Sequence, residues 1–255
     1  MTSPDTGPDF VVKLVETEEE LRAAQALRYD VFVRELGGGG DMVDHQFGLE
    51  RDRFDPFFDH MIVTDTSSGA VVGVYRLMRD DQAARAGQFY SEDEYDLTPL
   101  RQSDRRLLEL GRSCLHPKYR GGIAMFHLWN GLAEYVERNE IEILFGVASF
   151  HGTDTQALRA PLSLLHHNHL APPELRVRAR ETQFQTMDLI PADQLDRRAA
   201  MLEVPALIKA YLRLGGNVGE GAWIDHMFNT VDVCLVLDTA RMNARQRRLY
   251  EGGGR

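Results

Sequence analysis

The stretch from Leu107 to Asn139 constrains the fold more than any other part of the sequence. It begins with an apolar run, passes through a basic turn containing two glycines, and ends in an amphipathic run with helical spacing. A second apolar run follows directly. Because a strand, a helix and a further strand in this order pair in parallel, we predict a β–α–β unit with strands near 107–115 and 141–149 around a helix at 122–139.

The same patterns predict further elements around this unit. Alternation bounded by turn residues predicts strands at 10–15, 60–64, 71–79, 175–188 and 231–237. Helical spacing predicts helices at 16–34, 153–170, 195–200 and 205–214. Thr17 is expected to cap the first helix, with Glu20 completing a capping box, and four glycines end it. The segment 41–59 has no period, so we expect a loop whose phenylalanines pack back onto the domain.

The order of these elements defines a mixed α/β fold, with an α+β arrangement of its sheet. No internal repeat or sharp change of composition marks a domain boundary. We therefore expect a loose leader at 1–9, a single domain at 10–240 and a basic helical tail at 241–255.

Composition and charge exclude several classes of protein. Hydrophobic residues make up 43% and charged residues 27% of the 255 residues, as in ordinary soluble globular proteins. A formal net charge of −10 argues against nucleic-acid binding. No secretory signal or membrane-spanning run is evident, and two isolated cysteines fit a reducing compartment. We expect a cytoplasmic protein whose basic tail contacts an anionic membrane surface peripherally, at the inner face of the inner membrane.

Seven ordered blocks resemble one bacterial family. They are LRYDVFVREL (27–36), DRFDPFFDHMIV (52–63), VVGVYRLM (71–78), LELGRSCLHPKYR (108–120), ASFHGTD (148–154), PALIKAYLRLGG (205–216) and GAWIDHMFNTVDV (221–233). They resemble the ornithine N-acyltransferases of ornithine-lipid synthesis, a branch of the GNAT superfamily similar to the acyl-homoserine-lactone (autoinducer) synthases. The resemblance implies a GNAT-like fold with a C-terminal extension. It also implies transfer of a 3-hydroxyacyl group from acyl carrier protein to the α-amine of L-ornithine.

Two other interpretations stay open at this point. The acceptor could be another amino acid, such as glutamine or lysine, or the product could be an autoinducer lactone. Alternatively, the chain could be a catalytically silent GNAT domain that binds acyl carrier protein or lipid without turnover.

Glu109 and Arg112 are two charges in an otherwise apolar predicted strand. An α-amine must lose a proton before it attacks a thioester, and a carboxylate in a closed cleft can accept that proton. The autoinducer synthases carry Glu-x-x-Arg at the matching place, so the resemblance implies a catalytic role for both residues. In a regular strand the two side chains would point to opposite faces, and a bulge near Gly111 would bring them together. A structural ion pair is the alternative.

The turn at 116–124 resembles the phosphate-binding loop of GNAT enzymes, in which backbone N–H groups bind a pyrophosphate. The usual glycine spacing is broken, because Gly121 and Gly122 follow Arg120 directly. We therefore expect the phosphopantetheine arm of an acyl carrier protein as donor, rather than coenzyme A, and no permanently bound cofactor. Lys118 and Arg120 would contact the carrier protein, and the two glycines its arm. Solvated cations at a helix start are the alternative.

Five residues match the positions that organise the donor and acceptor site of the autoinducer synthases. They are Arg28, Phe32, Asp52, Asp55 and Arg76. The resemblance implies that they bind substrate. The two aspartates would hold the ammonium groups of ornithine, or pair with the two arginines and hold the loop against the sheet.

Ser149, Thr153 and Asp154 follow the predicted central strand. Ligands in open α/β sheets bind beyond the carboxyl ends of strands, so we predict that these residues contact substrate. A helix N-cap is the alternative for Thr153 or Asp154. We predict no metal site, since the histidines at 166–169 have no second ligand group at a recognised spacing.

Overall fold

A nine-stranded mixed sheet forms the centre of the computed structural model, which describes residues 9–244. Its strand order is β1 (Phe10–Leu14), β2 (Asp59–Asp65), β3 (Ala70–Arg79), β5 (Leu107–Leu115), β6 (Ile143–His151), β11 (Thr230–Asp238), β10 (Ala222–Asp225) and β8 (Phe184–Gln185). The ninth strand, β9 (Asn217–Val218), also pairs with β11. β5 and β6 run parallel, and the other described pairs in this sheet are antiparallel. The predicted parallel unit is therefore confirmed.

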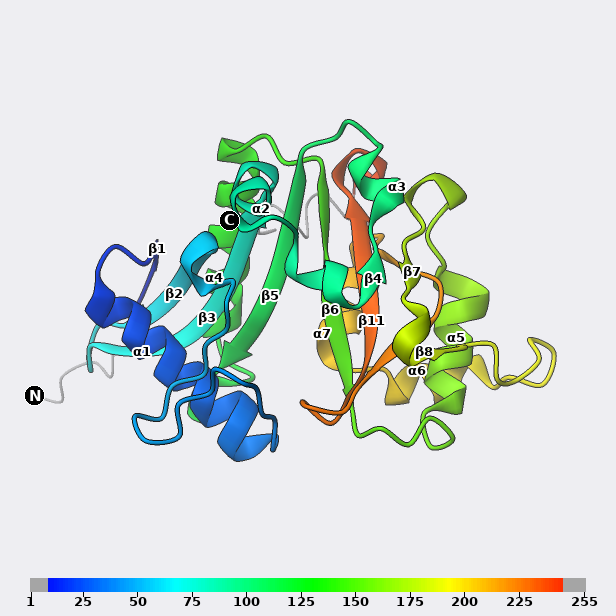
Figure 1. Cartoon of the computed structure of the whole chain (residues 1–255), viewed down its shortest axis with the longest axis horizontal. Coiled ribbons are helices and arrows are strands. Elements are labelled where there is room, and N and C mark those ends of the chain that lie inside the picture. Colours follow the sequence, from blue (N-terminus) through cyan, green and yellow to red (C-terminus); the bar gives the residue numbers. More distant parts are fainter. Residues whose placement is uncertain (1–8, 245–255) are drawn as a thin grey trace, which may run out of the picture.

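β5 and β6 pair only over their first three residues and then diverge towards their carboxyl ends (Figure 1). The last registered pair joins Glu109 to Phe145. Gly146 follows at once, and a Cβ placed there would lie 2.1 Å from the backbone oxygen of Leu110. Only glycine, which has no side chain, therefore allows β5 and β6 to approach this closely at the point where they begin to diverge.

Gly146→Ala is therefore expected to lower the free energy of unfolding by about 1–3 kcal/mol, because the strands must move apart to admit the methyl group. The matched control is Gly39→Ala, where the nearest atom, the oxygen of Met227, lies 3.6 Å from the added Cβ. Urea denaturation of both variants measures the difference. If both variants lower the free energy of unfolding by the same small amount, close contact at Gly146 does not control the spacing of β5 and β6.

Two helices cover opposite faces of the sheet. α1 (Glu18–Arg28) buries Ala24 and Leu27 in a cluster with residues from β2, β3 and β5, whereas α4 (Ala124–Arg138) packs on the alternate residues of the same strands. Thr17 accepts a hydrogen bond from the Glu20 amide, which confirms the predicted N-cap. The Glu20 carboxylate accepts from the Glu16 amide, so the capping box extends one residue further back than predicted. A π-helix (Tyr29–Glu35) continues α1 to the glycines.

The second half of the chain extends this sheet rather than forming a separate lobe (Figure 1). Its helices are α5 (Arg159–His169), α6 (Arg197–Glu203) and α7 (Ala206–Arg213). Buried residues of α5 and α7, such as Leu162 and Ile208, share one apolar cluster with α4 and β1. The predicted helices at 195–200 and 205–214 are thus present, and the one expected at 153–170 begins later, at Arg159.

The predicted strand at 175–188 is wrong. The structure has two short strands there, β7 (Arg178–Ala179) and β8, separated by a 3₁₀ turn. The amide of Ala179 donates to the oxygen of Glu220, and that of Arg180 donates to the oxygen of Glu94. Because these partners belong to two different segments, no single neighbouring strand extends the ladder. β7 instead pairs with β4 (Tyr95–Asp96) in a separate two-stranded sheet.

The remaining connections are short helices and a packed loop. They include α2 (Asp80–Ala86), α3 (Thr98–Arg101) and 3₁₀ helices at Asp55–Phe57, Tyr90–Asp93, Pro117–Tyr119, Pro173–Leu175 and Thr239–Arg241. The loop before β2 packs back as expected through Phe54 and Phe58, which are buried, whereas Phe47 is 63% exposed. None of the described helices has the length and apolarity needed to cross a membrane. Most of the predicted leader (residues 1–8) and of the predicted tail (245–255) lies outside the described residues.

Candidate active site

A bulge in β5 places Glu109 and Arg112 on the same side of the sheet. In the β3–β5 ladder Arg76 faces Gly111 and Val74 faces Cys114, so two residues of β5 oppose one of β3. Arg112 adopts a φ of +51°, a left-handed conformation. The strand is therefore not regular here: it has the bulge near Gly111 that brings the two charged side chains together, with Arg112 as its unusual residue. Both charged side chains contact Tyr90, which donates its amide hydrogen to Glu109 and stacks its ring 5.0 Å from the Arg112 guanidinium.

Glu109 is 1% exposed and accepts three hydrogen bonds. The amide and hydroxyl of Ser91 donate to Oε1, and the amide of Tyr90 donates to Oε2 at 2.8 Å. Burial raises the pKa of Glu109 to about 7, although these hydrogen bonds favour the ionised form. A carboxyl group with this pKa exchanges its proton near neutral pH, as a proton acceptor in catalysis must.

Three guanidinium groups and three carboxylates form a buried ionic network beside Glu109. Its members are Arg28, Arg76, Arg112, Glu50, Asp52 and Asp55. With all six groups ionised, three positive charges balance three negative ones. The network thus has no net charge left to hold a cationic substrate.

The aspartates of this network pair with its arginines. Asp55 accepts from Arg28 at 2.9 Å and from Arg76 at 2.6 Å, and Asp52 accepts from Arg76 at 2.7 Å. Burial acts to raise the pKa of Asp55, but the two guanidinium charges hold it well below its usual range. Of the two interpretations that the sequence leaves open, this geometry favours the pairing that fixes the loop against the sheet. Asp52 remains 20% exposed at the edge of the network.

Glu50 is the member of the network that the sequence patterns did not indicate. It lies in the loop before β2 and bridges Arg28 and Arg112. Despite its burial, the charges of Arg112 and Arg28 lower its pKa to about 2. Its only signal in the sequence is the high density of carboxylates in that loop.

A cavity of about 240 Å³ opens between the diverging strands next to Arg112. Its lining includes the polar side chains of Ser149, Asp225, Thr230 and Asp232 and the aromatic rings of Phe32, Tyr90 and Phe228. A smaller space of about 40 Å³ shares Gly111, Arg112, Ser113, Val147, Ala148 and Leu207 with it and continues among Leu110, Leu144 and Leu235. The two spaces form one slot, which has the carboxylates of Asp225 and Asp232 at one end, called its polar end, and mainly apolar side chains at the other.

The structure places the predicted site residues unequally around this slot. Phe32, Arg112 and Ser149 line it, whereas Glu109 is not among its lining residues and adjoins it through Tyr90, whose amide donates to Glu109.

Thr153 and Asp154 line neither part of the slot. Asp154 Oδ1 accepts from the amides of Gln156 at 3.0 Å and Ala157 at 3.2 Å, and so caps a turn that precedes α5. Asp154 thus has a capping role, the alternative that the sequence left open for it, and the predicted substrate contact of Thr153 and Asp154 stays a prediction.

The glycine-containing turn lies on the surface after β5. Lys118 and Arg120 are exposed, and the Arg120 guanidinium makes two hydrogen bonds to Glu35 at 2.6 and 2.7 Å. Gly121 has a φ of +74°, and α4 begins at Ala124, after Gly122 rather than at it. Arg120 is thus tied to the π-helix, while Lys118 forms no ion pair within residues 9–244 and points its charge to solvent.

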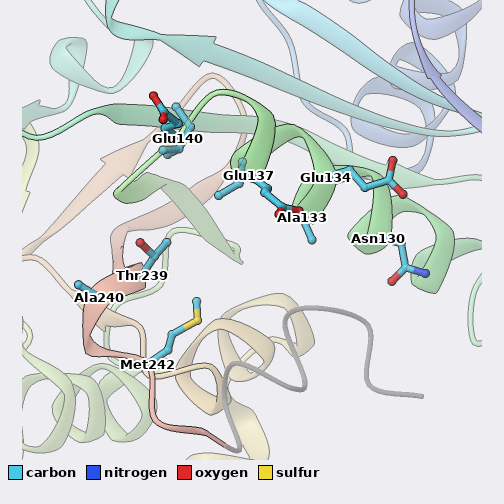
Figure 2. A pocket seen from close by; sticks show the side chains of 10 residues that line it. Asn130, Ala133, Glu134, Glu137, Glu140, Thr239, Ala240 and Met242 are labelled. Carbon is cyan, nitrogen blue, oxygen red and sulfur yellow. The ribbon is translucent and has the colours of Figure 1, made fainter. Parts of the chain in front are cut away.

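Other polar sites lie apart from this slot. A cavity of about 620 Å³ is lined by Glu134 and Glu137 of α4, by Glu140 just after this helix and by residues of the segment Thr239–Met242 (Figure 2). Its lining includes none of the predicted site residues. His166 and His167 lie near Asp188 at the surface, in an arrangement that could hold a metal ion. The only other such group within residues 9–244 is Glu94, Asp225 and Asp232, at the polar end of the slot.

Comparison with known sequences defines the family. The Acetyltransferase (GNAT) domain family matches residues 27–130. An L-ornithine N(alpha)-acyltransferase of Rhodobacter capsulatus is 58% identical over 246 residues, which cover 94% of each chain. The enzyme of the same name from Brucella abortus is 42% identical, over 94% of this chain and 88% of the relative. This chain belongs to the L-ornithine N(alpha)-acyltransferase family. The resemblance stated from the seven blocks is thereby confirmed.

Solved structures support the fold of this family member. The acyl-homoserine lactone synthase LasI superposes with a TM-score of 0.52 at 16% identity, covering 97% of both chains. The CoA-dependent acyl-homoserine lactone synthase BjaI superposes with a TM-score of 0.53 at 13% identity, covering 95% of this chain and 88% of that one. These similarities confirm the predicted GNAT-like fold with its mixed sheet.

Proposed function

We propose that this chain transfers a 3-hydroxyacyl group from the phosphopantetheine thioester of acyl carrier protein to the α-amine of L-ornithine. The observation that carries the proposal is the slot between β5 and β6, which joins a charged cavity to an apolar space. The charged cavity suits the ammonium and carboxylate groups of an amino acid, and the apolar space suits the chain of an acyl thioester. The names of the relatives supply the acceptor and the type of reaction.

Glu109 is the proposed proton acceptor. Its two carboxylate oxygens offer about four lone-pair positions, and three donors occupy three of them, which leaves one on Oε2. Glu109 accepts one proton from the α-ammonium, and the resulting neutral amine attacks the thioester carbonyl. The carbon–sulfur bond then breaks, the nitrogen gives its second proton to the departing thiolate, and the carrier leaves as the free thiol. Glu109 afterwards releases its proton to solvent. No acyl-enzyme is needed, so the product forms in a single displacement through a tetrahedral intermediate.

Two further features of the slot serve this reaction. Backbone N–H groups on the facing edges of β5 and β6, which do not pair beyond Glu109 and Phe145, are the proposed donors to the oxyanion. The Arg112 guanidinium, held by Glu50, Asp52 and the ring of Phe228, faces the cavity as a partner for the α-carboxylate of the amino acid.

The exposed turn after β5 is the proposed contact of the carrier protein. Lys118 offers a cation to an acidic carrier, and the backbone at Gly121 and Gly122 lies beside it for the phosphate of the arm. Because the product is a lipid, we further propose that the protein works at an anionic membrane surface, to which the basic tail would bind.

The decisive experiment offers the protein two donors and several acceptors. The donors are 3-hydroxyacyl carrier protein and 3-hydroxyacyl coenzyme A; the acceptors are ornithine, lysine and glutamine, with products identified by mass. We expect N-acylornithine from the carrier-protein donor. If product forms only with 3-hydroxyacyl coenzyme A, the assignment of the donor is wrong. If another amine reacts faster than ornithine, the assignment of the acceptor is wrong. Absence of product with every amine would favour the silent binding domain.

A further inference from the structure

Four buried side-chain atoms without a hydrogen-bond partner gather near the polar end of the slot. They are the oxygens Glu94 Oε2, Asp232 Oδ1 and Thr230 Oγ1 and the donor Trp223 Nε1, although the hydroxyls of Ser149 and Thr230 also act on the Asp232 carboxylate and act to lower its pKa. Such atoms are rare in folded proteins, because an unpaired buried polar group costs free energy. Three of the four atoms are oxygens, so a ligand with N–H donors would supply their missing partners, whereas the Trp223 N–H would need an acceptor.

The carboxylates at this place come from two distant parts of the chain. In the β10–β11 hairpin Trp223 pairs with Asp232 and Asp225 pairs with Thr230, so these four side chains share one face. Glu94 reaches the same point from the segment after the 3₁₀ helix at 90–93. One carboxylate oxygen from each of Glu94, Asp225 and Asp232 lies within 4.8 Å of the other two. We call these three residues the acidic cluster.

The acidic cluster lacks a cation. Glu94 and Asp232 are only 3% and 4% exposed, and within residues 9–244 no lysine or arginine forms an ion pair with any of the three carboxylates. The charge of Arg112 acts to lower the pKa values of Glu94 and Asp232, but its guanidinium forms its ion pairs with Glu50 and Asp52. Burial, together with the charges of the neighbouring acids, raises the pKa of Glu94 well above its usual value and that of Asp232 to about 6. A cation bound among these groups would relieve both effects.

The proposed reaction supplies a cation of suitable chemistry. Acylation of ornithine consumes the α-amine and leaves the δ-ammonium charged. A primary ammonium has three N–H donors and no acceptor, which suits a site formed by three carboxylates and the Thr230 hydroxyl. Asp225 and Asp232 line the same cavity as Arg112, so one amino acid would place its carboxylate on Arg112 and its side-chain ammonium among the acids.

We propose that the acidic cluster binds the δ-ammonium group of the ornithine acceptor. This inference rests on the proposed function. It means that the acidic cluster, rather than Asp52 and Asp55, selects an amino acid with a cationic side chain, because the arginines of the ionic network already neutralise those two aspartates. A neutral acceptor would leave the carboxylates unpaired. Lysine, one methylene longer, would be selected against by about 10–200-fold.

The experiment compares L-ornithine with L-norvaline, which has the same carbon chain without the δ-amine. We expect the wild-type kcat/KM for ornithine to exceed that for norvaline by about 10³-fold or more. Asp232→Asn and Glu94→Gln should each lower kcat/KM for ornithine by about 10–100-fold, mainly through KM, because the lost contact is remote from the reacting amine. Both variants should lower the value for norvaline by a much smaller factor, so that the ratio of kcat/KM for ornithine to that for norvaline falls by about 10-fold or more.

A matched control and a binding measurement separate recognition from folding. Asp238 is another buried acid, 8% exposed, at the other end of β11, and it pairs with Arg105 at 2.7 Å. Asp238→Asn should lower Tm but keep the preference for ornithine. Ornithine should raise the Tm of the wild type and of Asp238→Asn, but not that of Asp232→Asn.

Three results would overturn the inference. A parallel loss of activity towards ornithine and norvaline in Asp232→Asn would show that the cluster acts in folding or chemistry. The cluster would be a metal site if the purified protein contains a divalent metal and removal of that metal by a chelator abolishes the preference for ornithine. An equal thermal shift by ornithine in wild type and Asp232→Asn would show that ornithine binds elsewhere. If the wild type acylates neither acceptor, the proposed function fails, and the thermal shift alone still decides the role of the cluster.

Discussion

Glu109→Gln is expected to lower kcat by about 10²–10⁴-fold, the usual contribution of a positioned proton acceptor. In the wild type, kcat at saturating ornithine should rise as pH increases through about 7, the pKa to which burial raises Glu109. The sign follows from the chemistry, because the carboxyl group accepts a proton only in its ionised form. In the variant this rise should disappear. Steady-state rates between pH 5.5 and 8.5, roughly 1.5 units either side of that pKa, measure both effects.

Ser91→Ala provides a control that keeps the carboxyl group in place. The Ser91 hydroxyl donates to Glu109 Oε1 and favours its ionised form. Its removal should raise the pKa of Glu109 further and move the rise in kcat about one pH unit higher. If the rise persists unchanged in Glu109→Gln, another group accepts the proton. A rise near pH 6 that is lost in Asp232→Asn would identify that group, since the pKa of Asp232 is about 6.

Arg28→Met is expected to lower the free energy of unfolding by about 3–5 kcal/mol at pH 7, because it leaves buried carboxylates without their partner. Arg28 is fully buried and pairs with both Glu50 and Asp55. The control is Arg34→Met in the following π-helix, where the arginine is 67% exposed and pairs with Asp30. This exposed pair should contribute less than about 1 kcal/mol.

The pH dependence of Arg28→Met tests the cause of this loss. The pKa of Glu50 is lowered to about 2 and that of Asp55 is lowered further, so both carboxylates stabilise the wild type above their unfolded-state pKa values. That stability is lost as pH falls from about 4.5 towards 2. The difference between wild type and variant should therefore shrink over this range, as urea denaturation at successive pH values would show. A difference that stays constant would point to lost packing rather than lost charge.

Periodicity in the sequence correctly predicted the long strands of the central sheet. The predicted strands at 60–64, 71–79, 107–115 and 231–237 agree with the observed ones to within one residue at each end. Each of them packs one or both faces against helices or loops of the same domain, so its pattern is strong. The segment 175–188 has similar alternation, but its amides bond to two separate segments, a fact that no local pattern contains.

The candidate site was predictable where a charge interrupts an apolar run. Glu109 and Arg112 have that signal, and so does Asp232 between Val231 and Val233, although only the first two were recognised. Glu50 has no such signal, because it lies in an aperiodic loop and meets Arg112, 62 residues away, only through the fold. The zero net charge of the buried ionic network likewise depends on which charged side chains the fold brings together, and composition does not determine that.

The position of β11 also decides when this protein can first function as it is made. β11 begins at Thr230 but lies between β6 and β10, where it carries Asp232 into the slot. During synthesis on the ribosome, the edge of β6 therefore stays without its neighbour until almost the whole domain has emerged. An unpaired apolar strand edge is prone to wrong pairing with other chains. Nascent chains that stall before residue 230 should accordingly depend on chaperones and lack activity.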